Sequence, residues 1–346
     1  MGLHEEIFEQ PALLRRALGA QAGSIDPIAR AIQQHAVQYV FLAARGTSDH
    51  AGVYAQYVWG SLNQLPVALA APSLFTRYGD WPRLEQALVV GISQSGQSPD
   101  VVEVIAEGRR QGAPTLAITN NPASPLAAAA EFTLDIQAGP ENAVAATKTY
   151  TAELLAIAQL AAAMSPAPER RQAELALVPD AVQSALAAEA AIQRVAEAHA
   201  ADQQCVILGR GYNYSTALEW ALKLKEMAYL LADPYAAPDF MHGPIALIHP
   251  DYPVLAVAPG GAVLDDLLPL LRRLREELGA RLLVMSDRDE ALSIGQQGIR
   301  LPAGVPEWLT PLVAIVPAQL YAYHLTRARG YDTEAPRTIH KVTETL

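Results

Sequence analysis

The stretch that decides the fold is Ala87–Val104, which reads ALVVGISQSGQSPDVVEV. Its apolar run Leu88–Ile92 predicts a short strand buried on both faces, as in a parallel sheet. The polar turn Ser93–Ser98 follows, and Pro99 then favours a helix that begins there with Ser98 as its N-cap. A strand that leads into a helix through such a turn is typical of an α/β fold.

This turn holds more hydrogen-bond donors than a helix start requires. The free N–H groups at a helix N-terminus carry partial positive charge, and serine hydroxyls add further donors around an anion. An ordinary capped turn needs only Ser98 and Gly96, but four further polar side chains are present. We therefore expect a phosphate or other anion site. It is not a nucleotide P-loop, because no Gly-Lys-Ser/Thr sequence follows.

Composition narrows the class of protein. The 346 residues suffice for two domains, and 51% of them are hydrophobic. The net charge of −11 argues against nucleic acid or an anionic membrane as partner. The single cysteine, Cys205, excludes an internal disulfide and a cysteine-based metal cluster, and it lies in an apolar run that favours a buried hydrophobe. No signal peptide or transmembrane run is visible, so we expect a soluble cytoplasmic protein.

An internal repeat predicts two domains. Val40–Gly46 (VFLAARG) recurs as Cys205–Gly211 (CVILGRG). The last glycines of the two copies lie 165 positions apart. Leu88–Ser93 matches Pro253–Ala258 at the same offset. Two copies of a strand–helix alternation imply two α/β domains, each with a parallel sheet flanked by helices. The expected parts are leading helices over 1–35, domains over 36–165 and 195–330, and a tail over 331–346.

The two copies differ in their polar turns. The second copy has Pro259-Gly260-Gly261 where the first has Gln94-Ser95-Gly96, so it lacks the hydroxyl cluster. In open parallel sheets, ligands bind beyond the carboxyl ends of the strands, where both turns are expected. The first domain is therefore the expected holder of the anion.

The second copy contributes a charged helix instead. Glu219, Lys223 and Glu226 fall at i, i+4 and i+7 on one helix face, followed in the sequence by His242 before Gly-Pro. One interpretation is a solvated stripe of salt bridges. The other is an acid/base site, because the remaining helix positions are largely apolar and a loop histidine follows. Lys341, near the end of the chain, has no distinguishing signal of its own.

These segments together resemble the sugar isomerase (SIS) family, and above all the isomerase half of glucosamine-6-phosphate synthase. The resemblance covers nearly the whole chain and keeps the family's order of motifs. It rests on Arg45–Ser48, Ser93–Gly96, Val144–Lys148, Ala217–Glu226, His242–Pro244, and Pro336-Arg337 with Lys341.

The resemblance implies a role for each matching residue. Glu226 would move the proton between C1 and C2 of a sugar, with Lys223 near the developing charge. His242 would open the sugar ring from a second subunit of a homodimer, and Lys341 would lie by the anomeric carbon. Val144 would contact the substrate through its backbone. The sugar phosphate and its neighbouring hydroxyls would be bound by Thr47, Ser48, Ser93, Gln94, Ser95 and Ser98.

Departures from the synthase pattern shift the expected reaction. Gly2 follows Met1 where the synthase has a cysteine nucleophile, and a glutaminase domain is absent from this sequence. Pro238, Met241 and His340 replace the synthase's Gly, Lys and Ala. Three other segments look more like stand-alone glucosamine-6-phosphate deaminases: Ser48–Gly52, Gly96–Asp100 and Lys341–Thr343.

The leading hypothesis is therefore an enzyme that isomerises and deaminates a 6-phosphorylated amino sugar, giving fructose 6-phosphate from glucosamine 6-phosphate. This chemistry needs no metal and no cofactor. Alternatives are a synthase-type isomerase module without its glutaminase and an enzyme for galactosamine or fructosamine phosphate. A non-catalytic phosphosugar sensor is the third alternative, and Glu226, His242 and Lys341 together count against it.

Overall fold

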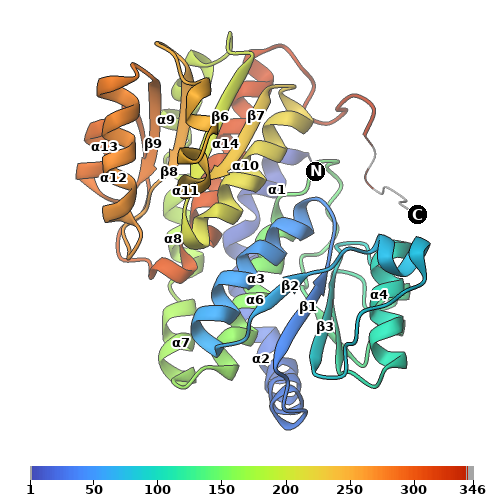
Figure 1. Cartoon of the computed structure of the whole chain (residues 1–346). Coiled ribbons are helices and arrows are strands. Elements are labelled where there is room, and N and C mark those ends of the chain that lie inside the picture. The colour runs from blue at the N-terminus through green and yellow to red at the C-terminus, as the bar shows by residue number, and fades with distance from the viewer. Residues whose placement is uncertain (1, 340, 342–346) are drawn as a thin grey trace. The chain divides into compact units, whose positions relative to one another are not determined.

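The computed structural model describes residues 2–339 and 341, which form two compact units (Figure 1). Of these residues, the N-terminal unit holds 12–142, 146–176 and 341. The C-terminal unit holds 2–11, 143–145 and 177–339. The domain bounds expected from the sequence repeat stay a prediction.

The N-terminal unit is built on a five-stranded sheet in the order β2-β1-β3-β4-β5, with every neighbouring pair parallel. The strands β3 and β4 are buried at every position because helices cover both faces of the sheet. The apolar runs that predicted these strands are thus core residues. The strands are β1 (Tyr39–Ala43), β2 (Val67–Leu69), β3 (Ala87–Ile92), β4 (Thr115–Thr119) and β5 (Phe132–Asp135).

Helices complete the N-terminal unit. Val101, Val104 and Ile105 of α4 belong to one buried cluster with Val89 of β3, which fixes that helix on the sheet. The long helix α6 packs against α3 and α7. The helices are α2 (Gln10–Gln34), α3 (Thr47–Asn63), α4 (Pro99–Arg110), α5 (Pro125–Ala129), α6 (Lys148–Met164) and α7 (Pro168–Leu175), with a π-helical turn η1 (Leu74–Tyr78).

The C-terminal unit repeats this topology. Its sheet has the order β7-β6-β8-β9-β10, again entirely parallel, so each strand has a counterpart in the first sheet. The prediction of two α/β domains with parallel sheets is confirmed. The strands are β6 (Gln204–Gly209), β7 (Leu231–Ala236), β8 (Pro253–Val257), β9 (Arg281–Ser286) and β10 (Gln297–Arg300).

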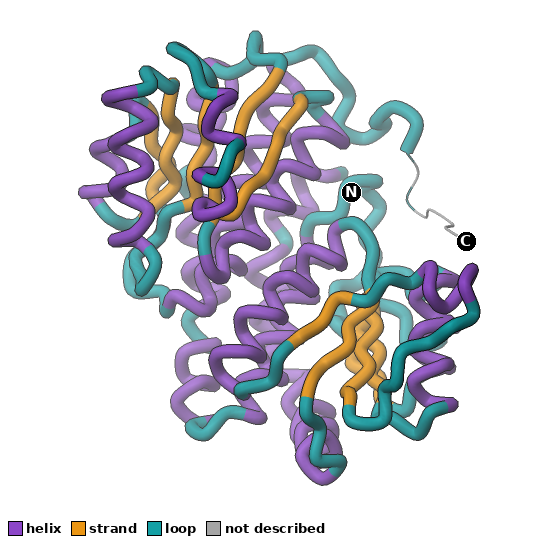
Figure 2. The backbone as a smooth tube through the Cα atoms, in the orientation of Figure 1, coloured by secondary structure: helices purple, strands orange, loops and turns teal. Residues whose placement is uncertain are grey.

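Helices also flank the second sheet (Figure 2). Leu267, Leu271 and Leu274 belong to a buried cluster with Val254 and Leu282 of the sheet. The helices are α1 (Leu3–Phe8), α8 (Val178–Leu186), α9 (Glu189–Ala198), α10 (Tyr214–Met227), α11 (Ala237–Met241), α12 (Leu264–Arg272), α13 (Asp289–Ile294) and α14 (Thr310–Ala328).

Within the part of the chain that the structure describes, no single helix has the length and apolarity needed to cross a membrane. One bent pair, Pro168–Leu186 with Glu189–Ala198, passes the same test of length and composition when its two halves are taken together.

Candidate functional site

The first turn of the candidate site joins β1 to α3. Gly46 has φ +53°, in the left-handed region that glycine adopts without strain, and it lets Thr47 begin the helix directly. Arg45 pairs with the buried Asp100 of α4 at 2.7 Å from Nε to Oδ2. The Ser48 hydroxyl donates to Glu153 Oε1 at 2.9 Å, so its proton is already used within the protein.

The second turn, Ser93–Ser98, follows β3, the strand beside β1. Because β1 and β3 are parallel neighbours, both turns lie at the same edge of the sheet. Gly96 has φ +65°, and a Cβ there would lie 2.1 Å from Ser124 Oγ, so only glycine fits. The Leu126 N–H donates to the Gly96 carbonyl at 3.1 Å, which fixes the turn against α5.

The hydroxyls of this turn are set up as donors. Ser93 Oγ accepts the Gly96 N–H at 3.1 Å, and Ser95 Oγ accepts the Gln97 N–H at 3.3 Å. Each oxygen acts as an acceptor in these bonds, so its own proton is left to donate elsewhere. Ser98 is the N-cap of α4 as predicted, but its hydroxyl makes no capping bond and lies 3.5 Å from Ser93 Oγ. The capping role expected for that hydroxyl is wrong, because the side chain turns toward Ser93.

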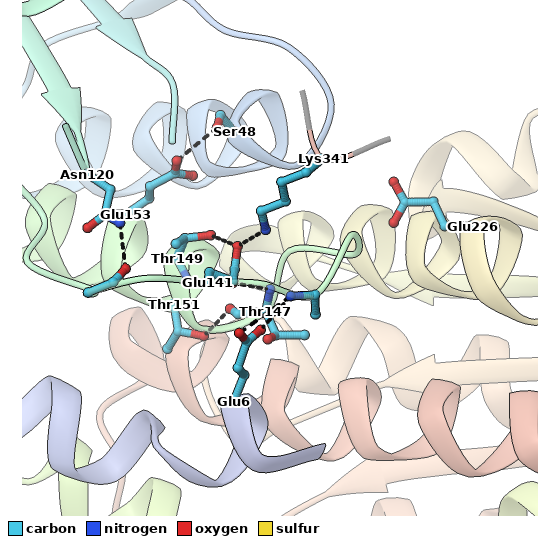
Figure 3. Close-up of polar contacts among 12 residues, drawn as sticks. Glu6, Ser48, Asn120, Glu141, Thr147, Thr149, Thr151, Glu153, Glu226 and Lys341 are labelled. Carbon is cyan, nitrogen blue, oxygen red and sulfur yellow. Dashed lines mark hydrogen bonds and ion pairs between the residues drawn. The ribbon is translucent and has the colours of Figure 1, made fainter. Parts of the chain in front are cut away.

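Two residues beyond the predicted set fix the next loop. Asn120, directly after β4, donates from Nδ2 to the Gly139 carbonyl at 2.8 Å and accepts the Ala138 N–H at 2.9 Å. This loop brings the Glu141 side chain, which is fully buried, to the start of α6. Glu141 accepts hydrogen bonds from the Thr147 N–H at 2.9 Å and the Thr149 hydroxyl at 2.8 Å (Figure 3).

Glu141 also pairs with Lys341 near the C-terminus. Lys341 Nζ lies 2.6 Å from Glu141 Oε2, and the lysine side chain is 26% exposed (Figure 3). The same carboxylate therefore orders the first turn of α6 and places the tail lysine in the N-terminal unit. Sequence reasoning missed Glu141, Asn120 and Glu153, since a lone acid or amide in a loop or apolar helix carries no pattern that distinguishes it. His340 and Val342–Thr343 lie outside the described residues.

In the C-terminal unit, α10 carries the charged row predicted from the sequence. Lys223 Nζ lies 3.3 Å from Glu219 Oε1 and 2.5 Å from Glu226 Oε2. The side chains of Glu219 and Lys223 are 0% and 1% exposed, whereas that of Glu226 is 23% exposed. The interpretation of a solvated stripe is therefore wrong. The row is buried and opens to water at Glu226.

The protonation of Lys223 follows from its surroundings. Burial by itself would lower the pKa of the Lys223 ammonium, but the charges of Glu219 and Glu226 outweigh burial and raise that pKa above its ordinary value. Lys223 is a fixed cation at neutral pH. It can orient the Glu226 carboxylate and donate a hydrogen bond, but it cannot act as a base.

His242 and Val144 belong to the C-terminal unit as well. His242 follows α11, its N–H donates to the Asp239 carbonyl at 3.1 Å, and the residue is exposed. This confirms that the histidine lies in a turn rather than on a helix face. Val144 is half-buried beside Ala143, whose N–H donates to Glu6 Oε2 at 3.3 Å.

The second copy of the polar turn is closed by the protein itself. The Gly260 N–H donates to Asp287 Oδ1 at 2.6 Å, and the Ala262 N–H donates to Glu307 Oε2 at 2.8 Å. A Cβ at Gly261 would lie 2.1 Å from the Glu307 side chain. Carboxylates of the chain thus occupy the N–H groups that an outside anion would need.

Neither a reactive cysteine nor a metal site is found among the described residues. Cys205 is buried, and burial raises the pKa of its thiol, so it is a packing residue rather than a nucleophile. Among the described residues, no group of three or more histidine, cysteine, aspartate or glutamate side chains could hold a metal ion.

The two five-stranded parallel sheets, alike in strand order and each flanked by helices, define a two-domain α/β protein. The SIS domain family matches residues 36–163 and 199–328, and the chain belongs to that family.

Several proteins of known name are similar to this chain over nearly its whole length. A glutamine–fructose-6-phosphate aminotransferase of Thermococcus kodakarensis is 33% identical over 346 residues, covering 97% of this chain. The chain spans 57% of that relative's length. The C-terminal domain of a glucosamine-fructose-6-phosphate aminotransferase from Francisella tularensis superimposes with a TM-score of 0.86 at 29% identity, covering 96% of both chains. A glucosamine-6-phosphate deaminase from Thermotoga maritima shares the fold, with a TM-score of 0.75 at 20% identity and 99% coverage of both chains.

Proposed function

We propose that this chain converts glucosamine 6-phosphate and water into fructose 6-phosphate and ammonia. The observation that carries the proposal is the Glu226 carboxylate, which reaches water while a buried ammonium holds it at 2.5 Å. A positioned carboxylate that can reach a substrate is what proton transfer between two adjacent carbons requires.

The phosphate would be held in the N-terminal unit. Ser95 and one of the pair Ser93 and Ser98, whose hydroxyls lie 3.5 Å apart and share one hydrogen bond, have hydroxyl protons that can point to a phosphate. Gln94 and Thr47 follow the same two strands and lie at the same sheet edge. Ser48 has given its hydroxyl proton to Glu153 and would contribute its backbone N–H at the start of α3. A phosphate bound in this way supplies remote binding energy that positions the reacting carbons.

The chemical steps balance without a redox partner. His242 assists ring opening, which exposes the C1 aldehyde. Glu226 removes the proton from C2 and returns it to C1. The oxygen on C1 gains the proton that the amine nitrogen loses and becomes a hydroxyl, while Lys223 keeps its charge and donates only a hydrogen bond to that oxygen as charge develops there. The product is a C2 imine. Water adds to C2, the C–N bond breaks, and ammonia leaves with the ketose.

The tail lysine would contact the anomeric end of the open sugar. Lys341 is held by Glu141 at 2.6 Å, and we assign it an orienting role at C1. The backbone of Val144 would contact the substrate, as the family resemblance implies. Deamination rather than amination is proposed on the segments that look like stand-alone deaminases, Ser48–Gly52 and Gly96–Asp100.

The deciding experiment measures ammonia release from glucosamine 6-phosphate, with galactosamine 6-phosphate as the epimer arm. Interconversion of fructose 6-phosphate and glucose 6-phosphate is followed as a separate isomerase arm. Ammonia from the glucosamine substrate alone supports the proposal. Isomerase activity without ammonia would instead favour a synthase-type module, and binding without turnover would favour a phosphosugar sensor.

The same proposal includes a homodimer in which His242 serves the neighbouring subunit. The histidine is exposed, and Met241 and Leu247 beside it are 44% and 50% exposed, which suits coverage by a second copy. Inactive His242→Ala protein mixed with inactive Glu226→Gln protein should recover part of the activity. No recovery, when subunit exchange is verified with labelled chains, would mean that the histidine serves its own subunit.

A further inference from the structure

Arg45 is a charged residue at the edge of the N-terminal sheet that has no role in the function proposed above. It lies between β1 and α3, in the turn that joins them. The turn Ser93–Ser98 follows β3, the parallel neighbour of β1, so Arg45 and that turn lie at the same edge of the sheet. A cation is thus present at the edge where the phosphate is expected.

Asp100 holds the guanidinium of Arg45 in place. Arg45 Nε donates to Asp100 Oδ2 at 2.7 Å, and the Asp100 side chain is only 2% exposed. Asp100 belongs to the first turn of α4, and its other oxygen accepts the Val101 N–H at 3.0 Å. The guanidinium is therefore fixed beside the start of α4, two residues after the N-cap Ser98.

The outer nitrogens of the Arg45 guanidinium can donate to a ligand. The side chain is 50% exposed, and Asp100 is its only hydrogen-bond partner in the part of the chain that the structure describes. Because Asp100 takes the Nε proton, the N–H groups on Nη1 and Nη2 are left for an acceptor from solution. A guanidinium presents them as a planar fork that matches two oxygens of one phosphate.

The carboxylates near Arg45 make a cation necessary for an anion at this edge. Asp100 is one, and Asp49 in the first turn of α3 is the other. Burial raises the pKa of Asp49, and the charges of His50 and Arg45 act in the opposite direction. The hydroxyls of the turn Ser93–Ser98 carry no charge. Without Arg45, a phosphate here would meet two acidic groups and only neutral donors.

We propose that Arg45 binds the phosphate of the sugar through Nη1 and Nη2 and selects a dianionic phosphate ester over a monoanionic sulfate ester. This inference rests on the proposed function, because it takes the turn Ser93–Ser98 as the phosphate site. Neutral donors distinguish the two esters only weakly. A fixed cation favours the ester with the larger negative charge.

Calorimetric titration of the full chain with fructose 6-phosphate and with fructose 6-sulfate measures this selection without turnover of an amino sugar. At about pH 7.5 the phosphate ester carries nearly two negative charges, whereas the sulfate ester carries one. The parent should bind the phosphate ester at least tenfold more tightly than the sulfate ester.

The variants separate the charge of Arg45 from its pairing with Asp100. Arg45→Gln alone would leave a buried carboxylate unpaired and could unfold the unit, so it is combined with Asp100→Asn. The double variant should bind the phosphate ester at least tenfold more weakly than the parent, and the sulfate ester about threefold more weakly at most. Asp100→Asn alone keeps the guanidinium and should bind the phosphate ester at least tenfold more tightly than the double variant.

The matched control is Arg83→Gln. Arg83 is exposed and precedes β3, at the opposite edge of the same sheet, so its loss should change neither affinity. Melting temperatures verify that each variant is folded before it is titrated.

Two results would overturn the inference and leave the proposed function standing. The first is equal affinity of the parent for the two esters. The second is a folded double variant that keeps the parent's affinity for the phosphate ester. If the parent bound neither ester up to about 10 mM, the phosphate site of the proposed function would be wrong, and this inference with it.

Discussion

The turns after β3 and after β8 occupy the same position in two sheets of the same topology, but their polar groups have different partners. In the N-terminal unit, the turn after β3 offers hydroxyl protons from Ser93 and Ser95. In the C-terminal unit, the turn after β8 gives its N–H groups to Asp287 and Glu307. We propose that the first turn receives an outside anion, whereas the second turn binds the chain's own carboxylates. The two units keep the same topology, and the C-terminal unit carries the buried charge row of α10 instead of a hydroxyl-rich turn.

The largest expected effect tests that second role. Glu226→Gln keeps the packing of α10 and removes the base, so kcat should fall by about 10²–10⁴-fold while substrate affinity changes little. Steady-state kinetics on folded protein measure this change. Glu277→Gln, on the exposed surface of the same unit, is the matched control. If Glu226→Gln turned over at a near-normal rate, Glu226 would not be the base.

The next effect tests the hydroxyl turn. Ser93→Ala with Ser95→Ala should raise the KM for the sugar phosphate at least tenfold, because charge-assisted hydrogen bonds to phosphate contribute roughly 1.5–3 kcal/mol each. Ser293→Ala, an exposed serine on α13, provides the control. An unchanged KM in a folded double variant would place the phosphate elsewhere.

The third prediction concerns the turn after β8, where carboxylates of the chain bind the backbone N–H groups. Asp287→Ala leaves the Gly260 N–H without its acceptor, so the free energy of unfolding should fall by about 1–3 kcal/mol. The KM for the sugar phosphate should not change. Denaturant unfolding and kinetics on the same preparation test both halves. A raised KM with unchanged stability would show that the two edges share the phosphate.

The smallest expected effect is on stability at low pH. As pH falls, the C-terminal unit should lose stability before the N-terminal unit does. In the C-terminal unit, Glu189 accepts hydrogen bonds from His4 at 2.6 Å and His324 at 3.1 Å. Burial lowers the pKa of His324, despite its bond to Glu189. Burial would raise the pKa of Glu189, but the two histidines outweigh it and hold that pKa below its ordinary value.

Both shifts have the same sign for stability. As pH falls below about 6.5, the unfolded chain takes up the His324 proton before the folded chain does, and stability declines. Below about 4.5, protonation of Glu189 removes the stability that its lowered pKa provides. Hydrogen exchange resolved by segment should show α9 and α14 losing protection before β3 and β4. His324→Gln should flatten the upper part of this decline, and an unaltered profile would contradict the assignment.

The sequence predicted the central strands because a strand buried on both faces is an uninterrupted apolar run, as in β3 and β8. It did not predict β7, which contains Asp233 and Pro234. A proline removes a ladder hydrogen bond and is tolerated at a sheet edge, and β7 is one of the two edge strands of its sheet. Its strand character comes from pairing with β6 rather than from its own residues.

The candidate site was predictable where its residues lie close together in the sequence. The turn Ser93–Ser98 and the row Glu219–Glu226 are local patterns with a recognisable spacing. Glu141 could not be found in this way, because its partner Lys341 lies 200 positions further along the chain. Burial was the second missing quantity. Spacing alone cannot separate a buried ion pair at Lys223 from a solvated one.

The helix α6 can couple two binding equilibria in the N-terminal unit. Its first turn is fixed by Glu141, which accepts the Thr149 N–H at 3.1 Å, and Gln159, ten residues later, lines a cavity shared with α2 and α7. At 1.5 Å per residue, these two positions are about 15 Å apart on one rigid rod. Coupling between two binding equilibria is reciprocal. Whatever factor a cavity ligand applies to sugar-phosphate affinity through α6, the sugar phosphate must return to that ligand.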